Sequence, residues 1–280
     1  MSATPASEQV RAALRVSGRR LSYLDSGAPG PLLLALHGHF AEARTFTPLA
    51  RRLAPHWRVV ALDQRGHGRS DRPPDFSREG YVEDAAALLR HLGGPGPAVV
   101  LGHSLGGVNA YHLAFRHPRL VRALIVEDIG AEVDGDLSFC LTWPHRAPTR
   151  AALLEALGGS APHLTDAVRE YADGWGLAFR PQDMAASQRG LNGDHWRAWL
   201  GSDCPALLLR GTRSAVLSAG HARAMAAARP RTRLVELPTG HTVHATDPER
   251  FAAAVRTFLT FLDGLPPQTH NRLPPAGPAR

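Results

Sequence analysis

The stretch 102–106, Gly-His-Ser-Leu-Gly, constrains the fold of this chain more than any other feature. It fits the pattern Gly-x-Ser-x-Gly, and the apolar run 97–101 before it is typical of a buried strand. Residues 107–115 after it read as a helix. A serine between such a strand and such a helix lies on a sharp turn that exposes its hydroxyl and directs a helix N-terminus at a bound group. The pattern predicts that Ser104 is a nucleophile; the alternative is a glycine-rich turn with a capping serine.

Short apolar runs alternate with helical patterns on both sides of this turn. The runs typical of strands covered on both faces are 32–36, 57–62, 97–101, 120–126, 206–209 and 233–237, and 10–16 and 19–24 are spaced as a hairpin. Helical patterns cover 41–54, 81–92, 219–228 and 248–262. This alternation predicts an α/β fold with a mostly parallel, doubly wound sheet and helices on both faces.

The alternation breaks down between residues 131 and 203. No buried strand is evident there, and helical patterns occur near 149–157, 164–172, 181–191 and 194–200. We therefore expect an α/β core formed by residues 1–130 and 204–263, with 131–203 inserted as a helical lid. Residues 264–280 are rich in proline and are expected to form a disordered tail.

The composition favours a protein of the cytoplasm. The first nine residues lack the apolar segment of a secretory signal, and the chain has no run of about 18 apolar residues that could span a membrane. Two cysteines, Cys140 and Cys204, form no disulfide framework. The formal charge of +7 comes from scattered arginines, which argues against a nucleic-acid partner. We expect a monomer or homodimer with a small-molecule substrate and without a nucleic-acid or membrane partner.

A serine hydroxyl becomes a nucleophile only with a base within hydrogen-bond reach. His241 directly follows the last predicted strand, and His244 is the second candidate for the base. The carboxyl ends of parallel strands share one edge of a sheet, where ligands bind. We therefore expect Ser104 and His241 to meet at that edge.

The tetrahedral intermediate of acyl transfer also needs donors for its oxyanion. We expect these to be the backbone N–H groups of Leu105, at the helix start, and of His39, in the loop after strand 32–36, with Phe40 as the next candidate. His37 and His39 could instead bind a metal, but further ligands at a suitable spacing are lacking. We therefore expect neither a metal nor another cofactor.

These motifs resemble those of the α/β-hydrolase fold superfamily over roughly residues 10–263. The matching stretches are His37-Gly38, residues 63–70 (Asp-Gln-Arg-Gly-His-Gly-Arg-Ser), residues 102–107 and Gly240-His241. The resemblance implies a serine-nucleophile enzyme, because Ser104 stands where the family's dehalogenases and epoxide hydrolases carry Asp. Residues 63–70 are mostly structural in the family. The family includes esterases, lactonases, amidases, carbon–carbon bond hydrolases and acyl transferases, so the resemblance does not identify the substrate.

The acid of the triad departs from the commoner family pattern. Many relatives carry it at the position of Ser214, but no Asp or Glu occurs here over residues 204–235. Some relatives place it after the strand that follows the nucleophile helix, where this chain has Asp128. Successive strand side chains point to opposite faces, so only one of Glu127 and Asp128 should point to His241. We expect Asp128; a capping Asp, or a Ser–His dyad without an acid, is the alternative.

Together these residues predict a serine hydrolase that cleaves an ester, lactone, thioester or amide through an acyl-enzyme. The lid holds four of the five tryptophans, and Trp143, Trp175 and Trp196 are candidates for binding an apolar part of the substrate, or else form the lid's own core. The rival functions are acyl transfer, cyclisation or carbon–carbon bond hydrolysis on the same triad, and non-catalytic binding of a small molecule.

Overall fold

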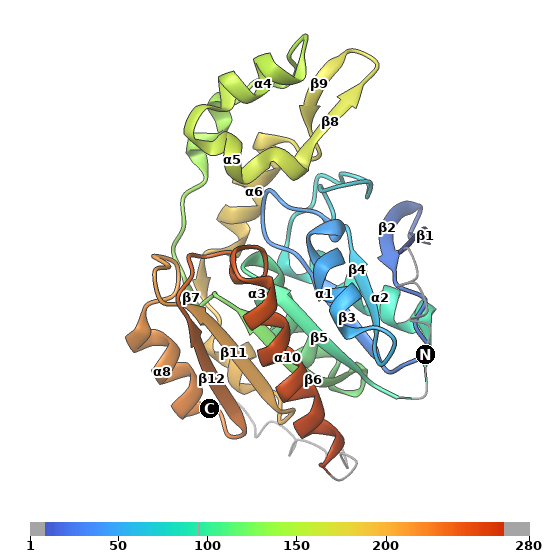
Figure 1. The fold of residues 1–280 in the computed structure, drawn as a ribbon, viewed down its shortest axis with the longest axis vertical. Helices are drawn as coiled ribbons and strands as arrows, with labels where there is room; N and C mark the ends of the chain where they lie inside the picture. Colours follow the sequence, from blue (N-terminus) through green and yellow to red (C-terminus); the bar gives the residue numbers. More distant parts are fainter. Residues whose placement is uncertain (1–8, 95, 266–280) are drawn as a thin grey trace, which may run out of the picture.

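An eight-stranded sheet forms the centre of the computed structural model, which describes residues 9–94 and 96–265 (Figure 1). From edge to edge the order is β1 (Val10–Val16), β2 (Arg19–Asp25), β4 (Arg58–Leu62), β3 (Leu32–Leu36), β5 (Ala98–His103), β6 (Val121–Glu127), β11 (Ala206–Gly211) and β12 (Thr232–Leu237). The β1–β2 and β2–β4 pairs are antiparallel, and the pairs from β4 to β12 are parallel. The predicted mostly parallel α/β sheet is confirmed.

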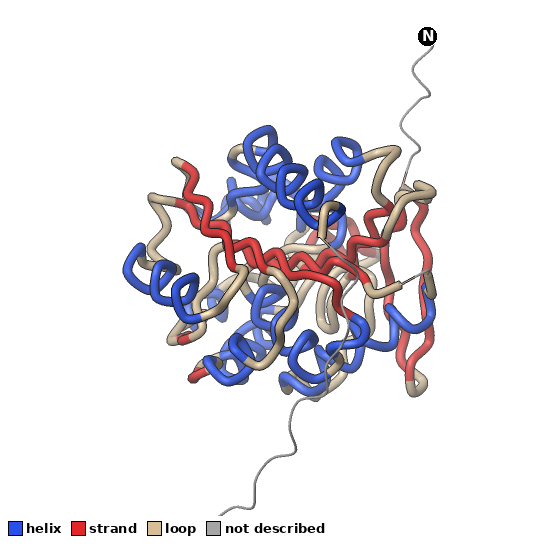
Figure 2. Tube along the Cα trace, turned by 90° about the horizontal axis from the view of Figure 1, so that it is seen from below, coloured by secondary structure: helices blue, strands red, loops and turns tan. Residues whose placement is uncertain are grey.

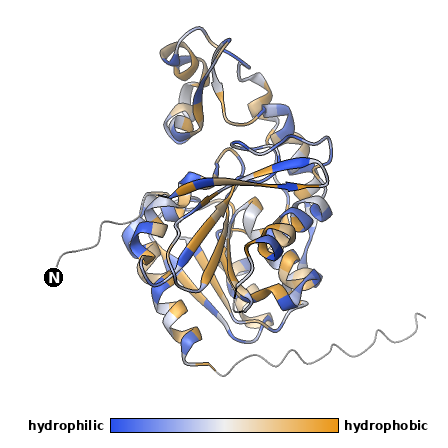
Figure 3. Ribbon diagram, turned by 90° about the vertical axis from the view of Figure 1, so that its right-hand side faces the viewer, coloured by the Kyte–Doolittle hydropathy of each residue, from blue (hydrophilic) through white to orange (hydrophobic). Residues whose placement is uncertain are grey.

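Helices cover both faces of this sheet (Figure 2). One layer contains α1 (Thr47–Leu53) and α10 (Pro248–Asp263), and the other contains α2 (Arg78–Leu92), α3 (Leu105–Arg116) and α8 (Ala219–Ala228). Within β3, Leu34 and Leu36 contact the α2–α3 layer, whereas Leu33 and Ala35 contact the α1–α10 layer. Burial on both faces explains why the strands are continuous apolar runs, and Figure 3 shows the central strands as largely hydrophobic.

Two short elements at the edge of the sheet differ from the sequence prediction. The helix expected over 41–54 is divided into a 3₁₀ turn, Ala43–Phe46, and α1, in which Pro48 occupies the first turn. The other is α9 (Val243–Thr246), a single turn that directly follows the loop of His241. A helix of four residues is too short to produce a periodic pattern in the sequence.

Residues 131–203, called here the inserted segment, leave the sheet after β6 and return before β11. The two ends of the segment are joined, because β7 (Glu132–Val133) pairs with β10 (Gly193–Asp194). Its helices are α4 (Arg150–Leu157), α5 (Ala161–Leu164), α6 (Pro181–Leu191) and α7 (Trp196–Leu200). Figure 1 shows α4 and α5 above the main body, and a separate small core holds them together. The function of this segment as a lid stays a prediction.

The helix predicted over 164–172 is wrong. Thr165–Ala167 forms a 3₁₀ turn, and Val168–Tyr171 forms strand β8, paired with β9 (Gly174–Leu177). The Tyr171 hydroxyl donates to the carbonyl of Leu177 at 2.8 Å, which closes the hairpin. Pairing with a later strand overrides the local helical pattern.

Within residues 9–94 and 96–265, no helix combines the length and the apolar character needed to cross a membrane. α10 ends at Asp263, so the predicted disordered tail starts directly after it. Residues 266–280 of that tail lie outside the described part of the chain.

Candidate active site

Ser104 lies on the turn between β5 and α3. Its backbone has φ 52° and ψ −120°, a conformation that is strained for a residue with a side chain. The turn is tight: a Cβ atom at Gly102 would collide with the carbonyl of Gly106, and one at Gly106 would collide with the carbonyl of Leu36. The N–H of Ser104 donates to the carbonyl of Glu127 at 3.0 Å, which fixes the turn against β6. The half-buried Ser104 is thus held at the carboxyl edge of the sheet.

Asp128 and His241 come from loops at the same edge and contact each other directly. Asp128 Oδ2 lies 2.8 Å from His241 Nδ1. The carboxylate is fully buried and accepts two further hydrogen bonds, from the N–H of Gly211 at 2.8 Å and from the hydroxyl of Ser214. Because the carboxylate accepts at Nδ1, it orients the ring and leaves Nε2 as a base. The His241 side chain is 32% exposed and can meet a ligand.

No hydrogen bond joins Ser104 to His241 among the described residues. Bonds between nucleophile and base are often long or misaligned in sites without substrate, and they shorten when substrate binds. Ser104 and His241 therefore lie at the same edge of the sheet, but the hydrogen bond between them is not formed in this structure.

A second carboxylate–histidine pair is formed by the neighbouring residue, Glu127, with His244. Glu127 accepts from the ring Nδ1 of His244 at 2.8 Å and from its backbone N–H at 2.9 Å. The hydroxyl of Thr45 lies 2.7 Å from His244 Nε2, so both ring nitrogens are occupied. The His244 side chain is only 2% exposed. The two carboxylates thus point to different histidines, and His244 has no free nitrogen for a substrate.

The ring of His103 packs against the rings of both His241 and His244. Its ring lies 4.6 Å from the ring of His241 and 5.1 Å from that of His244, measured between centroids. Burial lowers the pKa of His103 well below its usual value, with smaller contributions from His241 and His244, so the ring is neutral. Its Nε2–H donates to the backbone carbonyl of His241 at 3.1 Å. This contact ties the loop of the base to the strand that carries Ser104.

The loop after β3 approaches the same edge. In the described part of the chain, the N–H groups of His39, Phe40 and Leu105 donate to no backbone carbonyl. Burial, and then the charge of Arg78, lowers the pKa of His39 to about 3, which keeps its ring neutral. Phe40 has φ 66°, in the left-handed region.

The three candidate tryptophans lie in different surroundings. Trp143 packs against Phe40, with ring centroids 5.2 Å apart. Trp175 packs on the core of the inserted segment and pairs with Ala147 through two backbone hydrogen bonds of 2.8 Å. Trp196 packs on the main core, and its ring N–H donates to Glu132 at 2.6 Å. Of the three, the structure brings Trp143 to the loop of His39 and Phe40.

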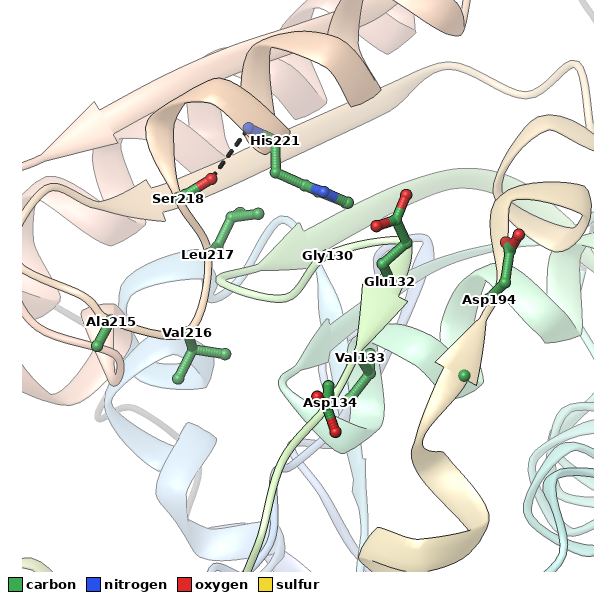
Figure 4. A pocket seen from close by; sticks show the side chains of 11 residues that line it. Gly130, Glu132, Val133, Asp134, Asp194, Ala215, Val216, Leu217, Ser218 and His221 are labelled. Carbon is green, nitrogen blue, oxygen red and sulfur yellow. Dashed lines mark hydrogen bonds between the residues drawn. The ribbon is translucent and has the colours of Figure 1, made fainter.

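An open pocket of about 530 Å³ lies beside the loops that flank Asp128 (Figure 4). Its lining includes Glu132 of β7 and the adjacent Asp134 on one side, and Val216 and His221 of α8 on the other. Neither Ser104 nor His241 lines it. No group of three or more His, Cys, Asp or Glu side chains in residues 9–94 and 96–265 is arranged to hold a metal ion.

Two polar contacts at the site have no signal in the sequence. Thr45 bonds to His244, and Ser187 of α6 lies 2.9 Å from His39 Nε2, but both residues fall in patterns that indicate ordinary helix. Ser214 carries a signal, because it occupies the position of the commoner acid. Its hydroxyl donates to the carboxylate of Asp128, so the two sequence positions at which the family carries the acid lie next to each other in the structure.

Comparison with known proteins identifies the family of the chain. A 2-(acetamidomethylene)succinate hydrolase of Mesorhizobium japonicum is 31% identical over 249 residues, which cover 82% of this chain and 88% of the relative. A pimeloyl-[acyl-carrier protein] methyl ester esterase of Chromobacterium violaceum is 30% identical over 257 residues, covering 85% of this chain and 97% of the relative.

A crystal structure of E-2-(acetamidomethylene)succinate hydrolase superposes with a TM-score of 0.80 at 26% identity, and the match covers 90% of this chain and 100% of that one. Residues 32–254 match the family model described as Alpha/beta hydrolase family. The match to the family model and the similarity to these relatives show that the chain belongs to the alpha/beta hydrolase family, and the sheet order and the turn at Ser104 agree with this.

Proposed function

We propose that this α/β hydrolase is a serine hydrolase that cleaves an ester, lactone, thioester or amide of a small, partly apolar substrate. The observation that carries the proposal is the contact between Asp128 and His241, at the edge where the turn presents Ser104. Among the relatives, one is a methyl ester esterase and another is a hydrolase of 2-(acetamidomethylene)succinate. Both activities support a small carboxylic acid derivative as substrate.

The reaction follows from the roles of the three side chains. His241 Nε2 takes the proton of the Ser104 hydroxyl while Oγ attacks the acyl carbon, and Asp128 stabilises the imidazolium that forms. The N–H groups of Leu105 and His39 bind the oxyanion of the tetrahedral intermediate. The imidazolium then gives its proton to the leaving group. Water, deprotonated by His241, attacks the acyl-enzyme, and collapse of the second intermediate restores Ser104.

The apolar part of the substrate is assigned to the aromatic side chains beside Phe40. Phe139 is 51% exposed and Leu141 is 46% exposed, which is high for large apolar side chains. Phe139 packs against Trp143, with ring centroids 5.6 Å apart. Exposed apolar surface next to a polar reaction centre is typical of a binding site for an apolar group.

The test is covalent labelling with a fluorophosphonate, followed by mass spectrometry of the adduct. We expect one adduct on Ser104 in the native protein and none in a Ser104→Ala variant. A panel of p-nitrophenyl esters of increasing chain length should then be hydrolysed by the native protein only. Labelling at another residue, or no labelling of the native protein, would overturn the assignment of Ser104.

A further inference from the structure

Two consecutive residues of the loop after β3 are held by side chains of the inserted segment. The first is His39, whose Nε2 lies 2.9 Å from the hydroxyl of Ser187 on α6. The same hydroxyl lies 2.9 Å from that of Tyr81 on α2. Burial raises the pKa of Tyr81 to about 12, so the phenol keeps its proton and can donate to Ser187. Ser187 can in turn donate to the neutral ring of His39, an arrangement in which both hydroxyl hydrogens have an acceptor.

The second residue is Phe40, which enters the core of the inserted segment. Its ring lies 5.2 Å from Trp143, 5.3 Å from Phe179 and 6.1 Å from Phe139, measured between centroids. The backbone of Phe40 has φ 66°, which is unfavourable for a bulky residue. Such a conformation persists only where the surrounding contacts determine it. The aromatic contacts supply that constraint, and they come from the inserted segment.

The other expected oxyanion donor is held differently. Leu105 is the first residue of α3, and its side chain is fully buried in the core of the sheet. The position of its N–H therefore follows from the packing of α3 on the sheet. The two donors are thus held by different contacts: the N–H of Leu105 by the start of α3, and the loop of His39 and Phe40 by Ser187 and the aromatic side chains.

We infer that the inserted segment positions the loop of His39 and Phe40 for catalysis, with Ser187 and Trp143 as positioning residues. The inference rests on the proposed function, because it concerns the oxyanion donors of that reaction. Loss of either contact lets the loop leave the geometry in which its N–H groups point at the oxyanion. A misplacement of about 1 Å can reduce a rate by about 100-fold.

The experiment measures how fast diisopropyl fluorophosphate labels Ser104. This probe is small, so its rate reports the reaction centre rather than the apolar site. We expect Ser187→Ala and Trp143→Leu each to lower the second-order rate constant by about 10- to 100-fold. With a short ester, kcat should fall by a similar factor while KM changes little.

The matched control is Tyr171→Phe, which also removes one hydroxyl hydrogen bond in the inserted segment but does not touch the loop. Its labelling rate should stay within about twofold of the native rate. Circular dichroism shows which variants are folded. If Ser187→Ala does not fold, Trp143→Leu still tests the inference, because Trp143 is only half-buried.

The outcomes separate the two proposals. No labelling of Ser104 in the native protein means that the proposed function has failed. Normal labelling of the native protein together with native rates in folded Ser187→Ala or Trp143→Leu overturns the positioning role. Equal slowing by Tyr171→Phe also overturns it, because the effect would then be a general loosening of the segment.

Discussion

Replacing Asp128 by Asn tests the contact between Asp128 and His241, because it exchanges one carboxylate oxygen for an NH₂ group. The N–H of Gly211 donates to Oδ1, so the amide oxygen of Asn must remain there and its NH₂ group must take the place of Oδ2. That position faces His241 Nδ1 and Ser214. An NH₂ group donates a hydrogen bond to Nδ1, which forces the ring proton onto Nε2. His241 then cannot accept the proton of Ser104.

The same change in a serine-protease triad lowers kcat by about 10⁴-fold, which corresponds to about 5.5 kcal/mol of transition-state stabilisation. We expect a loss of this order here. KM should change little, because Asp128 is fully buried and has no surface for a substrate. The assay is steady-state hydrolysis of a p-nitrophenyl ester, with circular dichroism to confirm that the variant is folded.

Two neighbouring variants serve as controls. Ser214→Ala removes one hydrogen bond to the carboxylate, a contribution of about 1.5–3 kcal/mol, so the loss should be at most about 160-fold. Glu127→Gln alters the carboxylate that binds His244, and turnover by the folded variant should stay within about tenfold of the native value. If Asp128→Asn keeps near-native turnover while Glu127→Gln loses it, the assignment of the acid is wrong.

Three further predictions concern the acid, acid stability and the turn. The double variant Asp128→Ala/Ser214→Asp should turn over at least about tenfold faster than Asp128→Ala alone, because Ser214 lies against the carboxylate that orients His241; equal rates would refute this. Burial lowers the pKa of six histidines, so below about pH 6.5 the unfolded chain binds protons that the folded chain does not: His37, His39, His67, His103, His112 and His195. The free energy of unfolding should therefore fall with decreasing pH, by at most about 8 kcal/mol per pH unit for six groups, and urea titrations that show no change from pH 7 to pH 5 would contradict it. Gly106→Ala should abolish native folding or the labelling of Ser104 by fluorophosphonate, because its Cβ would collide with the carbonyl of Leu36. A folded variant that is still labelled would show that the turn has room for a side chain.

The parts of the fold that could be predicted have local signals. All five residues of β3 are apolar because both of its faces are covered, and the turn at Ser104 carries its glycines at fixed spacing. The β8–β9 hairpin has no such signal, since residues 168–171 are also compatible with a helix and only pairing with 174–177 decides their structure. Elements fixed by distant contacts are therefore the ones that the sequence pattern misses.

The same distinction holds at the candidate site. The contact between Asp128 and His241 could be expected from the shared edge and from alternation along β6, which also directs Glu127 to a different histidine. The contact between His39 and Ser187 joins residues 148 positions apart, and a serine on a helix gives no sign of such a partner. The supporting contacts of the site thus depend on the packing of the inserted segment.

The distribution of positive φ angles has a consequence for how this chain can evolve. Among the described residues, five that are not glycine have positive φ, and three of them lie at the site: Phe40, Ser104 and Asp128. A left-handed backbone costs a residue with a side chain on the order of 1–2 kcal/mol, which is large beside a typical total stability of about 5–15 kcal/mol.

Ser104→Gly removes that cost at the turn, offset in part by the extra freedom of glycine in the unfolded chain. Mutants selected for heat resistance alone would be enriched in such replacements, and they would gain thermal tolerance as they lost the hydroxyl. Under the proposed function this replacement also removes the nucleophile, so a gain in stability at position 104 is expected to cost activity.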